Sequence, residues 1–147
     1  MYEHILVPLD QSVDSEKALA AAVGLAKQLG SRLTLCVVVT PLGPPDQTDV
    51  VRLGELGVQR ALAYLEKRSE ESRTAGVVNT DIEARQGDPA ESILEIAATR
   101  NVDLIAMSSH GLGRAYKYPL GSVALRVLMT APCPVLTIRT SPSISRP

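Results

Sequence analysis

One segment decides the fold class: Arg32-Leu33-Thr34-Leu35-Cys36-Val37-Val38-Val39. Its side chains are nearly all apolar or β-branched and do not alternate with polar ones, which is typical of a strand buried on both faces. Such a strand lies inside a parallel sheet that helices cover on both sides. The flanking sequence should therefore supply helices and further strands in alternation.

Outward from this segment, the expected elements alternate. Further strands are expected at 4–9, 77–85, 102–107 and 134–138, the second of them near a sheet edge. Helices are expected from residue 14 or 15 to Gly30, over about 53–75, from Pro89 with Asp88 as N-cap, and over 121–130. Five strands alternating with helices predict an α/β fold with one open parallel sheet and helices on both faces.

Length and composition indicate one domain. The 147 residues, 45% of them hydrophobic, can form a core without disulfides or metals. Residues 1–140 are expected to form this domain, and residues 141–147, which are rich in Ser and Pro, to form a flexible tail. Cys36 and Cys133 suggest two buried thiols, because two cysteines make neither a disulfide framework nor a zinc site.

The N-terminus has no signal-peptide pattern, and no apolar run approaches the ~18 residues of a membrane span. These features predict a cytoplasmic protein that does not enter the membrane.

Charge and aromatic content restrict the partners. Phe and Trp are absent and aromatic residues make up 3% of the chain, which leaves few surfaces on which single-stranded nucleic acid could stack. All 16 acidic residues precede residue 104, and the remainder carries five bases. Five dispersed bases are too few for a duplex but suit a small polyanion. A solvated basic end without a ligand is the alternative.

The loop from Ser108 to Ser122 is longer than the roughly 2–6 residues that such a connection needs. Small residues recur in it, Arg114 and Lys117 add positive charge, and the helix expected from Gly121 directs its N-terminus toward the loop. These features outline a phosphate cradle, although a flexible connection with Ser122 as helix cap is the alternative. The loop matches neither the Walker A pattern nor the dinucleotide fingerprint.

Several motifs, in order, make residues 2–139 resemble the universal stress protein family. They are Ile5-Leu6-Val7-Pro8-Leu9-Asp10-Gln11-Ser12, Gly87-Asp88-Pro89, and Ser109-His110-Gly111 followed after nine residues by Gly121-Ser122 and then by Ala131-Pro132-Cys133-Pro134-Val135-Leu136. The resemblance implies a Rossmann-like, five-stranded parallel sheet in the order 3-2-1-4-5. It also implies a homodimer and ATP in the crevice between the first and fourth strands, with any Mg²⁺ held mainly by the phosphates.

The resemblance also implies the nucleotide-binding positions. Asp10 stands at the nucleoside-binding carboxylate and Val38 at the position whose backbone meets adenine. The expected positions around the phosphates are Ser108, His110, Gly111, Arg114, Gly121, Ser122 and Val123.

Two positions depart from the family pattern. Ser108 replaces the first glycine of the phosphate motif, and Gln11 replaces the glycine that often follows the aspartate. Serine fits at position 108 if φ there is ordinary, and it is strained if φ is positive.

Four residues have competing interpretations. Asp10 either binds the nucleoside or caps the following helix, and Ser122 either binds phosphate or caps its own helix. His110 is expected to orient its loop rather than to act as a general base, and His4 to be a partly buried strand residue. No cluster of oxygen ligands indicates a metal site.

The preferred hypothesis is an adenine-nucleotide-binding regulatory module with little or no turnover and no catalytic residues. It would dimerise through the charge-poor last strand, which carries Val135, Leu136 and Ile138. A dimeric interaction protein without nucleotide and a slow ATPase are the alternatives, and ATP is not distinguished from cAMP.

Overall fold

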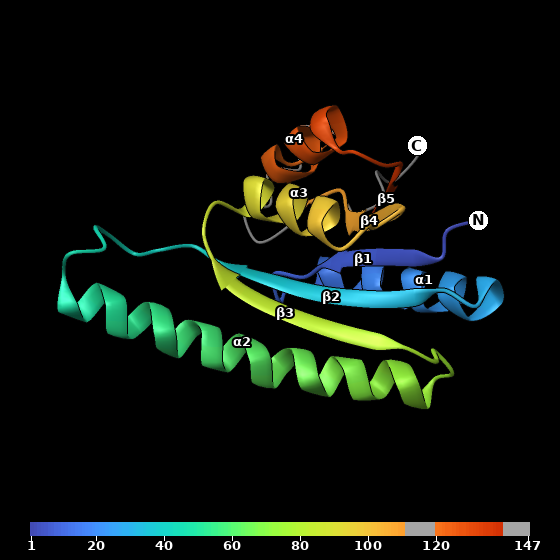
Figure 1. Cartoon of the computed structure of the whole chain (residues 1–147), viewed down its shortest axis with the longest axis horizontal. Coiled ribbons are helices and arrows are strands. Elements are labelled where there is room, and N and C mark those ends of the chain that lie inside the picture. Colours follow the sequence, from blue (N-terminus) through green and yellow to red (C-terminus); the bar gives the residue numbers. More distant parts are fainter. Residues whose placement is uncertain (111–119, 140–147) are drawn as a thin grey trace, which may run out of the picture.

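The computed structural model describes residues 1–110 and 120–139. Five parallel strands form one sheet in the order β3-β2-β1-β4-β5 (Figure 1). The strands are β1 His4–Pro8, β2 Arg32–Val39, β3 Thr80–Gln86, β4 Leu104–Ser108 and β5 Val135–Ile138. The helices are α1 Val13–Leu29, α2 Thr48–Thr74, α3 Pro89–Thr99 and α4 Ser122–Thr130. The expected fold class and strand order are confirmed, and the proposed tail 141–147 lies outside the described residues.

Two apolar layers hold the helices against the sheet. α1 and α2 cover one face, where Leu19 and Leu65 pack among the side chains of β1 and β2. α3 and α4 cover the other face, where Ile96 and Val127 pack against β1 and β4. Leu33 to Val37 are buried, so the interpretation of 32–39 as an interior strand is confirmed.

Local capping explains where two helices begin or end. Gly30 takes the left-handed conformation with φ of 69° and ends α1, as expected of a glycine C-cap. Asp88 accepts a hydrogen bond from the Glu91 amide at 3.0 Å, and Pro89 is the first residue of α3. Both expectations are confirmed.

β3 and β4 begin three and two residues later than predicted. The Val77 amide donates to the Ser72 carbonyl at 3.0 Å, and the Val102 amide donates to the Ala97 carbonyl at the same distance. Each valine thus closes the end of the preceding helix and buries its side chain there before the strand starts. The β-branched side chains of Val77 and Val102 therefore pack at the ends of helices and are not part of the strands.

Other boundaries shift as well. α2 begins at Thr48, about five residues before the predicted start, whereas β1 ends and β5 begins one residue inside their predicted ranges.

Cys36 is fully buried, and burial, reinforced by the charge of Glu83, raises the pKa of its thiol to about 12. Cys133 is only partly buried, so the expectation of two buried thiols is wrong for this residue. No helix within residues 1–110 and 120–139 is long and apolar enough to cross a bilayer.

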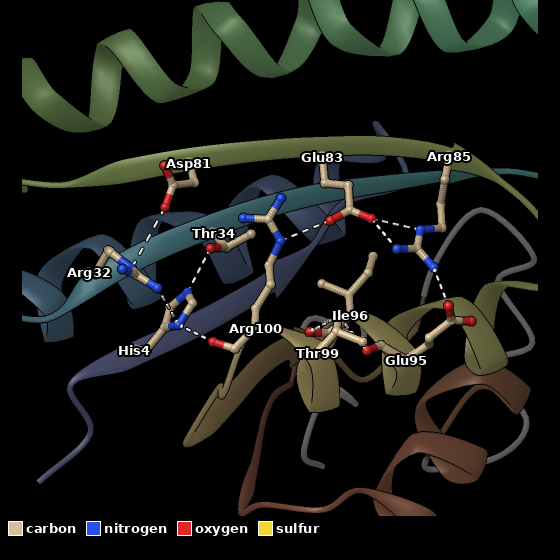
Figure 2. A network of polar contacts seen from close by, with 10 residues as sticks. All are labelled: His4, Arg32, Thr34, Asp81, Glu83, Arg85, Glu95, Ile96, Thr99 and Arg100. Carbon is tan, nitrogen blue, oxygen red and sulfur yellow. Dashed lines mark hydrogen bonds and ion pairs between the residues drawn. The ribbon is translucent and has the colours of Figure 1, made fainter.

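A polar network joins β1, β2 and β3 to α3 and to Arg100 at the end of that helix (Figure 2). His4 lies in β1, as expected, but is buried rather than partly buried, with Nδ1 3.0 Å from the Arg100 carbonyl oxygen and Nε2 2.6 Å from Thr34 Oγ1. Arg32 Nη2 lies 3.1 Å from His4 Nδ1. Burial and the nearby Arg32 charge lower the pKa of His4, because both disfavour the imidazolium.

Glu83 forms the second half of this network. Arg100 Nε lies 2.8 Å from Glu83 Oε1, and Arg85 pairs with the other carboxylate oxygen. Burial alone would raise the pKa of Glu83, but the hydrogen bonds from the two arginines outweigh burial and lower it. The Glu83 carboxylate is therefore held in its charged form by the two arginines.

The lowered pKa of His4 makes stability depend on pH. The unfolded chain takes up a proton near pH 6.5, whereas the folded protein takes it up only at lower pH, so the free energy of unfolding should fall as pH decreases below about 6.5. Denaturant unfolding between pH 7.5 and 5.5 measures this slope. His4→Gln should flatten it, and an unchanged slope in this variant would contradict the assignment to His4.

Candidate functional site

The strand order reverses at β1. The chain leaves β1 toward β2 and β3 and then crosses to β4 on the other side, and α1, after β1, lies on one face of the sheet while α4, after β4, lies on the other (Figure 1). In open α/β sheets the ligand crevice forms at such a reversal. The candidate residues that the structure describes follow β1 and β4, lie at the end of β2, or begin α4.

The backbone pairing of β1 with β4 stops before Pro8. The β1–β2 register continues to Pro8↔Cys36, and the Leu9 amide donates to the Cys36 carbonyl at 2.7 Å. The β1–β4 register stops at Leu6↔Ile105. Because backbone groups alternate along a strand, the nitrogen of Pro8 faces β4, where it has no hydrogen to donate. The crevice begins where this ladder stops.

Asp10 supports the cap of α1 but does not itself cap the helix. Asp10 Oδ1 accepts from the Ser12 amide at 3.1 Å and from Ser12 Oγ at 2.5 Å, while Ser12 Oγ accepts from the Ser15 amide at 3.1 Å. Ser12 is thus the N-cap, and the alternative in which Asp10 caps the helix is wrong. Asp10 remains partly exposed at the crevice end of β1.

Gln11 takes the left-handed conformation, with φ of 65°. This region favours glycine, which explains why glycine suits the position after the aspartate. Gln11, where this chain departs from the family pattern, therefore has a strained backbone between Asp10 and the N-cap Ser12.

Val38 directs its backbone toward the crevice. The Val39 carbonyl accepts from the Gly87 amide, on the β3 side, at 3.1 Å, and the Cys36 carbonyl accepts from Leu9, on the β1 side. Alternation therefore turns the Val38 N–H and C=O to the β1 side, beyond the last residue of β1. This geometry agrees with the expectation that Val38 contacts a ligand through its backbone.

Ser108 fits its position without strain. It is the last residue of β4, and its φ is not among the positive values in the described chain, so the unstrained alternative holds. Its Oγ donates to the His110 carbonyl at 2.6 Å. The serine hydroxyl thus shapes the turn that follows the strand.

His110 is buried, with 2% of its surface exposed, and its Nδ1 lies 3.3 Å from Ser109 Oγ. This placement agrees with a histidine that orients its loop and does not present a general base to the crevice.

α4 begins against the loop after β4. The Gly121 amide donates to the Ser109 carbonyl at 2.7 Å, and a Cβ at Gly121 would lie 3.3 Å from that carbonyl oxygen. The glycine therefore permits a close approach between helix and loop. Larger side chains here would displace the start of α4.

Gly121, not Ser122, is the N-cap of α4, so the interpretation of Ser122 as helix cap is wrong. Glycine supplies no capping side chain, and the amides of Ser122, Val123 and Ala124 have no acceptor within the helix. The first intrahelical bond runs from the Leu125 amide to the Gly121 carbonyl. Three amides and the positive end of the helix dipole can thus serve an anion, with the exposed Ser122 side chain beside them.

Gly111 and Arg114 lie outside the described residues, as do Tyr116, Lys117 and Tyr118. Within the described chain, no group of three His, Cys, Asp or Glu side chains could hold a metal ion. Ser12 and Ser109 were not among the predicted binding residues, although both shape the site. Ser12 carried a signal, a serine directly before a helix with acidic residues in its first turn. No sequence signal indicated that the Ser109 carbonyl accepts a hydrogen bond from the Gly121 amide.

Comparisons with known proteins agree with this geometry. The model of the universal stress protein family matches residues 1–139. A Thermus aquaticus protein, named universal stress protein in QAH/OAS sulfhydrylase 3′ region, is 36% identical over 144 residues, covering 95% of this chain and 100% of that protein.

Two solved structures extend the likeness. Universal stress protein UspA from Lactobacillus plantarum has a TM-score of 0.86 and 27% identity, covering 94% of this chain and 98% of that one. A universal stress protein in complex with cAMP has a TM-score of 0.74 and 25% identity, covering 95% of this chain and 99% of that one.

The strain at Gln11 is testable by substitution. Gln11→Val should lower the free energy of unfolding by about 1–2 kcal/mol, because a β-branched side chain fits the left-handed region poorly. Gln11→Gly should change it by less than about 1 kcal/mol, since relief of strain offsets the greater entropy of the unfolded chain. Gln28→Val on the exposed face of α1 is the control in denaturant unfolding. Equal losses at positions 11 and 28 would contradict the strain.

Proposed function

The chain belongs to the universal stress protein family, and from that premise we propose that it binds an adenine nucleotide, ATP in the first place, as a regulatory module. One observation carries the proposal: the uncapped start of α4 meets the loop after β4 at the strand-order reversal. Amides for phosphates and backbone groups of Val38 for a base then share one crevice. The bound cAMP in a related structure supports an adenine ligand.

In this proposal the nucleotide spans the crevice. Asp10 receives the nucleoside, Val38 meets the base through its backbone, and Ser122 and Val123 offer amides to the phosphates. Ser108, His110 and Gly121 act by shaping the backbone around the phosphates. Gly111 and Arg114 belong to the same proposed set, and any Mg²⁺ would be held by phosphate oxygens and water.

We propose binding with little or no turnover. Support comes from His110, which is buried beside Ser109 and therefore has little contact with water. A slow ATPase is the alternative. Its rate should then fall in Asp10→Ala, whereas a rate unchanged by this substitution would indicate a contaminating enzyme.

We place the protein in the cytoplasm. The free thiols Cys36 and Cys133 support a reducing compartment.

A charge at the start of α4 tests the phosphate site. Ser122→Asp should stabilise α4 through the helix dipole and weaken ATP binding by about tenfold or more, because the new carboxylate repels the phosphates. Adenosine, which has no phosphates, should bind as before. Calorimetric titration measures both ligands, with Ser122→Asn as the neutral control.

The first measurement on the unmodified protein is mass spectrometry of small molecules released on denaturation. ATP or ADP in this fraction, or a rise in thermal stability with excess MgATP, supports the proposal. An empty protein that ignores MgATP would contradict it and favour an interaction module without nucleotide. Equal loss of ATP and adenosine in Ser122→Asp would contradict the placement of the phosphates.

We also propose a homodimer through β5. This strand lies at the edge of the sheet, and its Leu136 side chain is 41% exposed. An apolar groove beside it is lined by Met1, Tyr2, Leu25, Leu29, Leu104, Pro134, Val135 and Leu136. Pairing of two such edges would satisfy the open backbone groups and cover the apolar side chains.

Light scattering tests the dimer. The unmodified protein should have about twice the chain mass of 15.7 kDa, and Leu136→Glu should reduce it to the monomer mass, because the charge would be buried in the interface. Val78→Glu, a change at an 80% exposed valine before β3, should leave the dimer intact. A monomer at micromolar concentration would contradict the proposal.

A further inference from the structure

An ion pair joins α4 to the start of α3. Arg126 Nη1 lies 3.1 Å from Asp88 Oδ2, and Arg126 Nη2 lies 3.8 Å from Glu91 Oε1. The same Asp88 oxygen accepts the hydrogen bond from the Glu91 amide that caps α3. Arg126 therefore holds α4 through the cap of its neighbouring helix, which lies beside it (Figure 1).

Packing alone restrains α4 weakly. The helix has nine residues, of which Ala124 and Val127 are buried and Val123 packs partly buried against the same core. So few small side chains give limited resistance to rotation of the helix about its own axis, because few interlocking contacts would be lost. At its start, the Gly121 amide also donates to the Ser109 carbonyl.

The cap of α3 also connects to the other end of the candidate site. Gly87, next to Asp88, donates its amide to the Val39 carbonyl at 3.1 Å. A Cβ at Gly87 would lie 2.7 Å from Ser92 Oγ, and φ is 156°, so this turn suits glycine. Gly87 and Asp88 thus link the end of β2 to α4.

We propose that Arg126 is a positioning residue for the phosphate end of the nucleotide. Its pair with Asp88 and Glu91 orients the first amides of α4 toward the phosphates, and the bond from the neighbouring Gly87 to Val39 anchors Asp88 at the end of β2. The inference rests on the proposed nucleotide binding. Arg126 acts without touching the ligand.

The chain offers a clean way to break this pair. Asp88→Asn keeps the N-cap, because asparagine caps helices as well as aspartate does, and removes the charge that Arg126 needs. Arg126→Gln removes the other partner. Glu71→Gln neutralises an ion pair on α2, with the partly buried Arg68, far from α4, and is the control.

Calorimetric titration of the full chain with ATP and with adenosine tests the proposal. Arg126→Gln and Asp88→Asn should each weaken ATP binding about two- to fivefold, since an exposed pair can transmit no more than its own free energy. The double variant should be no weaker than either single one. Adenosine affinity should not change, and Glu71→Gln should leave both ligands unaffected.

Three outcomes would overturn the positioning role. Tighter ATP binding in Asp88→Asn would mean that a released Arg126 binds phosphate directly. Unchanged ATP affinity in both single variants would mean that the pair is only a surface contact. Equal weakening of ATP and adenosine would mean a general structural effect.

Amide hydrogen exchange distinguishes failure of the positioning role of Arg126 from failure of the proposed nucleotide binding. In the protein without nucleotide, both variants should accelerate exchange in α4 relative to α1. Unchanged exchange in α4 would overturn the positioning role even if ATP binds. An unmodified protein that binds neither ATP nor adenosine would overturn the proposed function, and this inference with it.

Discussion

The parallel pairing of β1 on both of its sides is the constraint on which the remaining structure depends. All five residues of β1 are buried, with β2 on one side and β4 on the other. Because the chain must reach both neighbours through helices, the loops after β1 and β4 leave in different directions. The position of Asp10 relative to Ser108 and α4 follows from this topology. Pro8 reinforces the separation, since it cannot donate a ladder hydrogen bond to β4.

The candidate site is built mainly from backbone groups. Val38 offers its N–H and C=O, the start of α4 offers amides, and Gly121 allows the helix to approach the Ser109 carbonyl. This construction explains how Ser108 can stand where the family pattern has glycine: its φ is ordinary and its hydroxyl bonds within the loop. Gln11, in contrast, stands in place of a glycine at a left-handed position, and its backbone is strained.

His4 and Asp10 lie at opposite ends of β1. His4 begins the strand and contacts Arg32, whereas Asp10 follows its other end. Arg100 joins the two halves of the polar network, since its carbonyl lies by His4 and its guanidinium by Glu83 (Figure 2). The Glu83 half continues to Arg85, which is in register with Val38 of the candidate site.

Local sequence by itself determined the order of elements, the interior strand at 32–39, the caps at Gly30 and Asp88, and the loops that carry the candidate site, because hydrophobic periodicity and capping depend on neighbouring residues. The resemblance to the family, carried by its motifs, predicted the strand order. The tertiary structure alone decided that Val77 and Val102 close helices, that Gly121 is the N-cap of α4, and that the Val38 backbone faces the crevice. It also gave the Asp88 carboxylate its second partner, Arg126. These features depend on contacts between residues distant in sequence, or on which of several nearby hydrogen bonds the packed chain permits, and no local pattern encodes that choice.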